Sequence, residues 1–126
     1  MKAISPAPPT ARLSHLGARR WAAASGRATG LTVLCHGYGE TPGRWAAFVS
    51  QVAPVVPNME FVAPEAPNAM PGTSEGRHWW DYADRNPGAV AAGISGSAHH
   101  VTGFIVDELG RTGLPLSACV LAGFSQ

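Results

Sequence analysis

The last four residues, 123–126 (Gly-Phe-Ser-Gln), have the clearest potential for chemistry. Gly123 lets the backbone bend without a Cβ clash, so Ser125 can stand on a tight, strained turn. These residues match the first four positions of the pattern Gly-x-Ser-x-Gly, in which the serine hydroxyl is a nucleophile. Taken alone, the four residues fit an ordinary strand-to-loop turn with a solvated serine equally well.

A second loop with chemical potential consists of residues 36–39, His-Gly-Tyr-Gly, where two glycines permit an unusual backbone path. His36 is a residue type that serves either as a base or as a hydrogen-bonding support. Both loops follow apolar runs, which must position them.

Three short apolar runs predict buried strands at residues 31–35, 59–63 and 119–122. Helical patterns separate the runs, and this order predicts an α/β fold with a parallel sheet flanked by helices. Ligands of such sheets gather beyond the carboxyl ends of the strands, so the two loops are expected to face one another.

Two amphipathic helices are expected to cover the sheet. The first has Thr41 as its N-cap, begins at Pro42 and ends at Pro54, and the second begins between residues 89 and 94 and stops at Gly113. Their expected core-facing stripes are Trp45, Phe48, Val49 and Val52 in the first helix, and Ile94, Ala98, Val101, Ile105 and Leu109 in the second. His99 and His100 lie beside the second stripe and are expected to be solvated.

Residues 64–87 contain four prolines, two glycines and no periodicity, which predicts a long surface excursion. Trp79 and Trp80 within it either line an acyl or alcohol pocket or cover an edge of the core. The sequence shows no metal ligands at useful spacing and no phosphate-binding glycine pattern, so we expect neither a metal nor a cofactor.

Nine basic residues against eight acidic ones give a net charge of +1, which argues against nucleic acid or an anionic membrane surface as a partner. Cys35 and Cys119 fall in expected strands and should be reduced. No signal peptide and no stretch of membrane-spanning length is recognised, so we expect a cytoplasmic protein.

Residues 1–28 are rich in Pro, Ala, Ser, Gly and Arg. This composition predicts a flexible segment or a loose edge strand before a domain at 29–126.

Several segments in one linear order resemble the phospholipase/carboxylesterase family, which includes acyl-protein thioesterases and bacterial carboxylesterases with the α/β-hydrolase fold. They are residues 31–39, the proline-rich stretch after Phe61, Trp79-Trp80-Asp81, Gly93-Ile94 and residues 122–126. The resemblance covers about residues 29–126 and implies that this is the N-terminal part of such a fold.

The resemblance implies that Ser125 is the nucleophile and that the backbone N–H groups of Tyr38 and Gln126 form the oxyanion hole. His36 would shape the oxyanion loop together with Gly37 and Gly39, because in this fold the triad Asp and His follow the serine along the chain. The implied substrate is a small carboxylic ester, thioester or lysophospholipid. The sequence does not choose among these, and it leaves the oligomeric state open.

Every Asp and His of this sequence precedes Ser125, so we expect the triad Asp and His that the resemblance implies to be absent from these residues. We therefore expect these 126 residues alone to turn over little or no ester, and the C-terminal carboxylate to oppose a nearby oxyanion. The alternative is a non-catalytic α/β binding or interaction module that completes its sheet with a partner chain. A nucleotide-binding α/β domain ranks last, because the glycine pattern after the first strand is absent.

Overall fold

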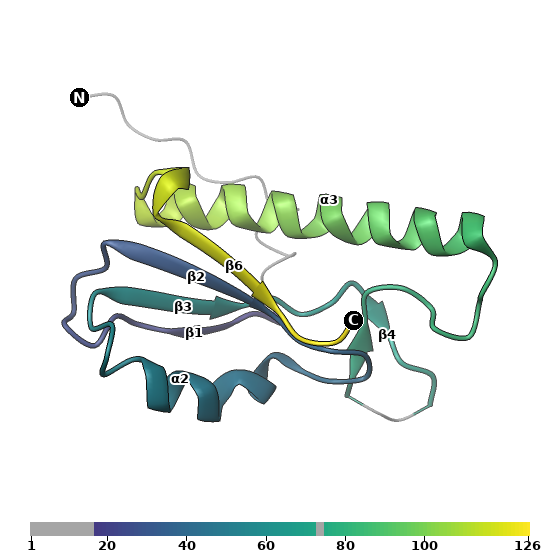
Figure 1. Ribbon diagram of the computed structural model, residues 1–126, viewed down its shortest axis with the longest axis horizontal. Coiled ribbons are helices and arrows are strands. Elements are labelled where there is room, and N and C mark those ends of the chain that lie inside the picture. The colour runs from purple at the N-terminus through teal and green to yellow at the C-terminus, as the bar shows by residue number, and fades with distance from the viewer. Residues whose placement is uncertain (1–16, 73–74) are drawn as a thin grey trace.

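A computed structural model describes residues 17–72 and 75–126 of the chain (Figure 1). Its elements, in chain order, are β1 (Arg19–Trp21), β2 (Gly30–Cys35), the 3-10 helix η1 (Pro42–Trp45), α2 (Ala46–Val52), β3 (Met59–Ala63), β4 (Asn68–Ala69), β5 (Arg77–His78), α3 (Pro87–Thr112), the 3-10 helix η2 (Leu116–Ala118) and β6 (Cys119–Gly123).

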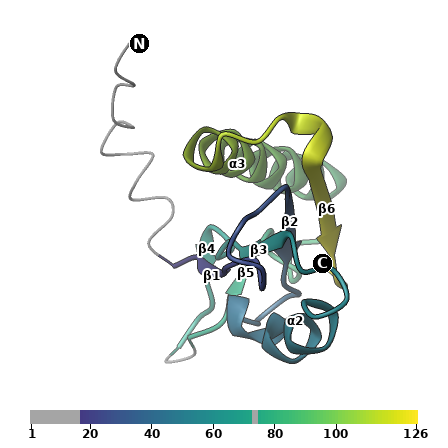
Figure 2. The same cartoon turned by 90° about the vertical axis from the view of Figure 1, so that its left-hand side faces the viewer.

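The main sheet has the strand order β1-β3-β2-β6, in which β2 runs parallel to both β3 and β6. This confirms the predicted α/β fold with a parallel sheet, to which β1 adds one antiparallel edge strand. α2 and α3 lie on opposite faces of the sheet (Figure 2). In the β2–β6 register Cys35 pairs with Gly123, so the two strands end level and the loops that follow them emerge side by side.

β1 belongs to the segment for which the sequence predicts a flexible tail or a loose edge strand. Residues 1–16 of that segment lie outside the described part of the chain. Arg19–Trp21 pair with β3, and the amides of Ser25 and Thr29 donate to the carbonyls of Pro57 and Asn58 at 2.8 Å. Residues 17–28 are thus attached to the sheet, and the domain boundary at residue 28 stays a prediction.

The helix expected from Pro42 forms in two parts, η1 followed by α2. Thr41 occupies the N-cap position but makes no capping hydrogen bond with its side chain, so the predicted cap is wrong in that respect. Trp45 and Val49 are buried against Leu34 and Phe61, as predicted. Phe48 is 44% exposed, so its place in the predicted core-facing stripe is wrong. α2 ends at Val52, before Pro54.

α3 begins earlier than expected, at Pro87, where the Asn86 side chain accepts hydrogen bonds from the amides of Gly88 and Ala89. It ends at Thr112 and is capped by Gly113, whose φ of +75° is a left-handed conformation that glycine adopts without strain.

The predicted core-facing stripe of α3 is confirmed at its C-terminal end, where Ile105 and Leu109 pack against the core cluster of β2 and β3, and is wrong at its N-terminal end. The buried residues of the helix are Ser97, Phe104 and Glu108, whereas Ile94 of the stripe is 47% exposed. Phe104 packs on the β2–β3 face, and Ser97 donates its hydroxyl hydrogen bond to the Trp79 carbonyl. Polar side chains can lie beneath the helix because each has a partner there.

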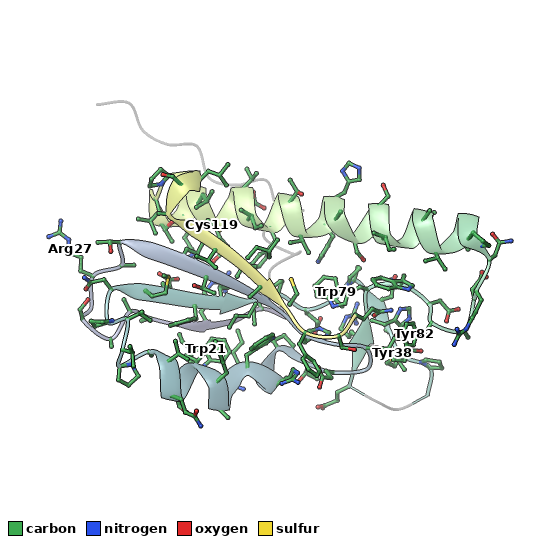
Figure 3. All side chains as sticks on the ribbon, viewed as in Figure 1. Trp21, Arg27, Tyr38, Trp79, Tyr82 and Cys119 are labelled. Carbon is green, nitrogen blue, oxygen red and sulfur yellow. The ribbon has the colours of Figure 1, made fainter. Side chains whose placement is uncertain are left out.

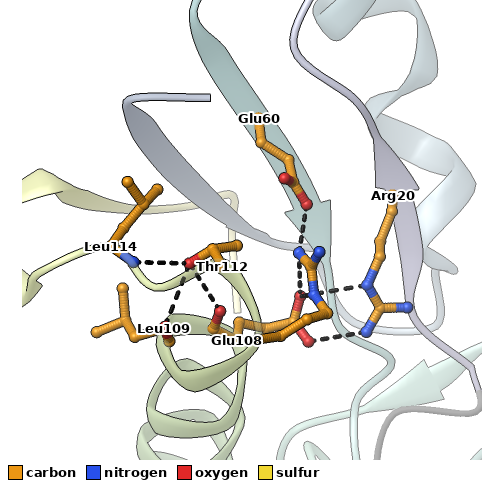
Figure 4. Close-up of polar contacts among 7 residues, drawn as sticks. Arg20, Glu60, Glu108, Leu109, Thr112 and Leu114 are labelled. Carbon is orange, nitrogen blue, oxygen red and sulfur yellow. Dashed lines mark hydrogen bonds and ion pairs between the residues drawn. The ribbon is translucent and has the colours of Figure 1, made fainter. Parts of the chain in front are cut away.

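Glu108 is fully buried and connects three elements (Figure 4). Both of its carboxylate oxygens accept hydrogen bonds from Arg20 of β1, at 3.2 and 2.8 Å, and Arg111 also donates to it at 2.9 Å. Arg111 in turn pairs with Glu60 of β3. Burial by itself raises the pKa of Glu108, but the hydrogen bonds and charges of the two arginines outweigh it, so the net pKa lies below its ordinary value.

α3 is long and apolar enough to cross a membrane, judged by length and composition alone. It has 26 residues, and its most apolar 18-residue window has a mean hydropathy of 1.2 and is 11% buried. The expectation that no stretch approaches spanning length is therefore wrong on these two criteria. They are weak evidence for a span, because a helix packed on a soluble domain passes the same test, and α3 lies along the sheet through Phe104 and Glu108.

Candidate active site

Ser125 lies just beyond the carboxyl end of β6, where the Phe124 amide still donates to the Cys35 carbonyl at 3.2 Å. Its φ is +62°, and it is the only non-glycine residue with a positive φ in the described part of the chain. A left-handed conformation costs a residue with a Cβ about 1–2 kcal/mol. The serine is exposed on this strained turn, as the sequence predicts for Gly-x-Ser-x.

The loop after β2 approaches Ser125 closely. A Cβ placed on Gly37 would lie 3.3 Å from the Ser125 Cβ and 3.3 Å from the Phe124 carbonyl oxygen, so only glycine fits there without displacement. The structure therefore brings residues 36–39 and Ser125 together, as the parallel sheet predicts.

Two backbone N–H groups near Ser125 have no hydrogen-bond acceptor among residues 17–72 and 75–126. In the described part of the chain, neither the amide of Tyr38 nor that of Gln126 donates a hydrogen bond, whereas the amides of Gly37, Gly39 and Glu40 all do. Unpaired donors beside a strained serine are the kind of groups that can stabilise an oxyanion.

Glu40 and Arg44 support this loop, and the sequence analysis did not identify either residue. The Glu40 carboxylate accepts from the Gly37 amide at 2.7 Å and pairs with Arg44 at 2.8 Å. The Arg44 guanidinium lies 3.7 Å from the centre of the Phe124 ring, directly before Ser125. The spacing of four residues between Glu40 and Arg44 was the one signal in the sequence for this pair.

His36 is fully buried and both ring nitrogens are occupied. Its Nδ1 lies 2.8 Å from the Gly37 carbonyl oxygen, and its Nε2 lies 3.1 Å from the Ala66 amide. Because the carbonyl only accepts and the amide only donates, the neutral ring carries its proton on Nδ1. Burial lowers the pKa of His36, although the Gly37 carbonyl and nearby carboxylates oppose this. His36 thus joins two loops and has no free nitrogen with which to act as a base.

Trp79 and Trp80 differ in their surroundings. Trp79 is 4% exposed and donates from its indole Nε1 to the His36 carbonyl, so it covers the core (Figure 3). Trp80 is half-buried and lies against Gly93 of α3, where an added Cβ would come within 2.5 Å of the Trp80 Cβ.

The side chain of Gln126 fixes both tryptophans to the end of β6. Its Oε1 accepts from the Trp79 amide at 3.0 Å, and its Nε2 donates to the Trp80 carbonyl at 2.7 Å. The sequence points only to the backbone of Gln126, and no local signal indicates these side-chain contacts.

Two hollows meet at Trp80. One, of about 460 Å³, lies between α3 and β6 and includes Ser125 in its lining. The other, of about 690 Å³, has a more polar lining that includes Arg77, His78 and Asp81. Tyr38 stacks on His78 and Tyr82 beside it, with ring centres 5.5 and 5.0 Å apart.

The remaining described histidines make no hydrogen bond with Ser125. His99 and His100 of α3 are expected to be solvated, and this holds only for His99. His99 is exposed, but His100 lies 3.3 Å from the Glu65 carbonyl oxygen and has an edge contact with Trp79.

Cys35 lines the hollow that includes Ser125, and burial raises the pKa of its thiol to about 11, so the thiol stays protonated. No group of three or more potential metal ligands occurs in the described residues.

Comparisons with known proteins identify the fold and family that carry these two loops. The crystal structure of esterase PE8 matches with a TM-score of 0.79 and 32% sequence identity, over 89% of this chain and 53% of the esterase chain. The chain thus spans about half the length of that esterase. The model of the phospholipase/carboxylesterase family matches residues 18–126, which include both loops of the site. With nearly the whole described chain covered by that match, the protein belongs to the phospholipase/carboxylesterase family of α/β-hydrolase-fold proteins.

Proposed function

We propose that this chain is part of a serine hydrolase that cleaves carboxylic esters or thioesters, with Ser125 as its nucleophile. The observation that carries the proposal is the positive φ of Ser125 at the end of β6, beside the loop after β2. A strained, exposed serine at that place presents its hydroxyl to a substrate carbonyl. Membership of the phospholipase/carboxylesterase family and the match to an esterase support the same reaction class.

In the proposed reaction, the Ser125 oxygen attacks the carbonyl carbon and its proton passes to a base. The developing oxyanion accepts hydrogen bonds from the unpaired amides of Tyr38 and Gln126. Glu40 accepts from the amide of Gly37, next to Tyr38, and pairs with Arg44, so the two side chains support the loop that carries the first amide. The Gln126 side chain supports the second amide by its contacts with the tryptophan segment. His36 acts as a positioning residue for the loop.

The proposal does not assign the base. His36 has both nitrogens occupied, and no described histidine bonds to Ser125. We therefore infer that the 126 residues alone acylate slowly and turn over little ester. A serine without its base retains only the contribution of the oxyanion hole and substrate binding, about 10³–10⁴-fold over water in a well-studied protease.

The substrate is inferred to be a small molecule, and Trp80 is the tryptophan that would contact it. Trp80 borders both hollows, whereas Trp79 borders only the one that includes Ser125. Trp79 is also 4% exposed and donates its indole N–H to the His36 carbonyl, so little of its ring is open to a substrate. A cytoplasmic location and the choice among carboxylic ester, thioester and lysophospholipid stay predictions.

Acylation of the purified chain tests the assignment of the nucleophile. With p-nitrophenyl acetate at pH 8, peptide mass spectrometry is expected to find the acetyl group on Ser125 at least about tenfold ahead of other serines. Ser125 stands on a strained turn beside the amides of Tyr38 and Gln126, which have no acceptor among the described residues. The variant Ser125→Ala should lose that product. Equal modification of many serines would refute the nucleophile, and steady hydrolysis at about 10 s⁻¹ would refute the inferred inactivity of the chain alone.

A second function, a non-catalytic interaction module, is favoured by two observations. The described residues include no histidine hydrogen-bonded to Ser125, while β6 offers an open strand edge. It predicts that a soluble, folded chain gives no preferential acylation of Ser125.

A further inference from the structure

Residues 76–80, called here the bracing segment, lie against the loop that follows β2. The Gly39 amide donates to the Arg77 carbonyl at 2.8 Å, and the Arg77 amide donates to the Glu40 carbonyl at 3.0 Å. These two hydrogen bonds make an antiparallel bridge between Glu40 and Arg77. The loop at residues 36–40 is therefore paired with the bracing segment as one strand is paired with another.

Gly76 marks the closest approach of the two backbones. It is buried, and a Cβ built on it would overlap the carbonyl group of Gly39. The atoms that this Cβ would meet belong to the backbone, so they cannot move aside as the end of a flexible side chain can. A residue other than glycine at position 76 must therefore separate the bracing segment from the loop.

The ring of Tyr38 is stacked on the same part of the chain. It contacts the His78 ring of the bracing segment and the Tyr82 ring just beyond it, with ring centres 5.5 and 5.0 Å apart (Figure 3). The Nδ1 atom of His78 is buried and has no hydrogen-bond partner in the described part of the chain. His78 thus meets Tyr38 through its ring face, and the stack restricts the residue whose amide is one proposed oxyanion donor.

The other end of the bracing segment contacts the second proposed donor residue, Gln126. The Gln126 side chain accepts from the Trp79 amide at 3.0 Å and donates to the Trp80 carbonyl at 2.7 Å. The Trp79 indole also donates to the His36 carbonyl at 2.6 Å. One short stretch of chain therefore contacts both residues whose amides are the proposed oxyanion donors.

We propose that the bracing segment fixes the positions of the two oxyanion donors relative to Ser125, with Gly76 and His78 as its positioning residues. Donors stabilise an oxyanion only when they are held where the charge develops, and a displacement of about 1 Å costs about 10²-fold in rate. The catalytic part of this proposal rests on the proposed function. The bracing itself does not require that Ser125 is a nucleophile.

Gly76→Ala tests the close approach. Acetylation of Ser125 by p-nitrophenyl acetate is expected to slow at least about tenfold, because the loop with the Tyr38 amide is displaced. Gly72→Ala is the control: Gly72 has a φ of +84° and no atom within 4 Å of a built Cβ, so this change strains the backbone nearby without touching the loop. The control should react as fast as the parent chain, and equal slowing of both variants would overturn the proposal.

Hydrogen exchange tests the bracing without any reaction at Ser125. In Gly76→Ala, the amides of Gly39 and Arg77 are expected to exchange at least about tenfold faster than in the parent, while the amides of β2 keep their protection. Unchanged exchange of Gly39 and Arg77 would overturn the bracing. A parent chain that is not acylated at Ser125 would instead refute the proposed function, and the exchange result would still decide the bracing.

Two substitutions of His78 test the stack and do not depend on the folding of Gly76→Ala. His78→Ala removes the ring beneath Tyr38 and is expected to slow acetylation of Ser125 at least about threefold. His78→Phe keeps an aromatic ring without nitrogen atoms and should restore the rate of the parent. A His78→Ala chain as fast as the parent, or a His78→Phe chain as slow as His78→Ala, would overturn the positioning role of the stack.

Discussion

Replacing Glu108 by Gln tests whether the buried ion network holds α3 on the sheet. The carboxylate has no exposed surface, while the side chains of Arg20 and Arg111 are 34% and 42% exposed. Hydrogen bonds to a charged group contribute about 1.5–3 kcal/mol each, but arginines this exposed recover part of their hydration when the charge is lost. We therefore expect a net loss of about 2 kcal/mol in the free energy of unfolding at pH 7.

Urea unfolding followed by tryptophan fluorescence measures this loss. For a domain of this size, about 2 kcal/mol corresponds to a decrease in Tm on the order of 10 °C. Glu75→Gln is the control, because it removes the same charge from an exposed position. A Glu108→Gln variant within about 0.5 kcal/mol of the parent would show that the network contributes little, as exposed ion pairs often do.

The pH dependence of the same variant gives a second test. The folded-state pKa of Glu108 lies below its ordinary value, so its contribution is present above about pH 4.3 and is lost as the pH falls through the folded pKa. The stability difference between the parent and Glu108→Gln should therefore shrink below about pH 4.3. A difference that stays constant into strong acid would refute the role of the charge.

Three other predictions concern the site and its supports. Gly93→Ala places a methyl group 2.5 Å from the Trp80 Cβ and should destabilise the fold by about 1–3 kcal/mol. Gly96→Ala, whose methyl group would have no neighbour within 4 Å, should stabilise the fold by up to about 1 kcal/mol. Thermal melts of both variants test this pair of predictions. Because the folded pKa of His36 is lowered, stability should fall as the pH drops below about 6.5 toward that pKa, and urea melts of His36→Gln should show a flatter pH dependence. Ser125→Gly should be about 1 kcal/mol more stable than Ser125→Ala in urea unfolding, because glycine adopts the φ of +62° without strain, and equal stabilities would argue against a strained turn.

The sequence was sufficient to identify the parallel α/β fold and the two loops of the candidate site. Strands at 31–35, 59–63 and 119–122 lie within one or two residues of the observed ones, because short apolar runs between turn residues are a local signal. The meeting of residues 36–39 with Ser125 followed from the rule that parallel strands end at the same edge of the sheet.

Only the tertiary structure decided what supports the site and which way α3 faces. Gln126 bonds to the tryptophan segment 46 and 47 residues away, and His36 bonds to Ala66 across 30 residues. Such contacts depend on how distant segments are placed, which periodicity cannot encode. Phe104 and the partnered Glu108 occupy sheet-facing positions of α3. Of the predicted stripe, Ile105 and Leu109 pack beside them, whereas Ile94 is exposed. A sequence pattern marks an apolar face without stating which neighbour it meets.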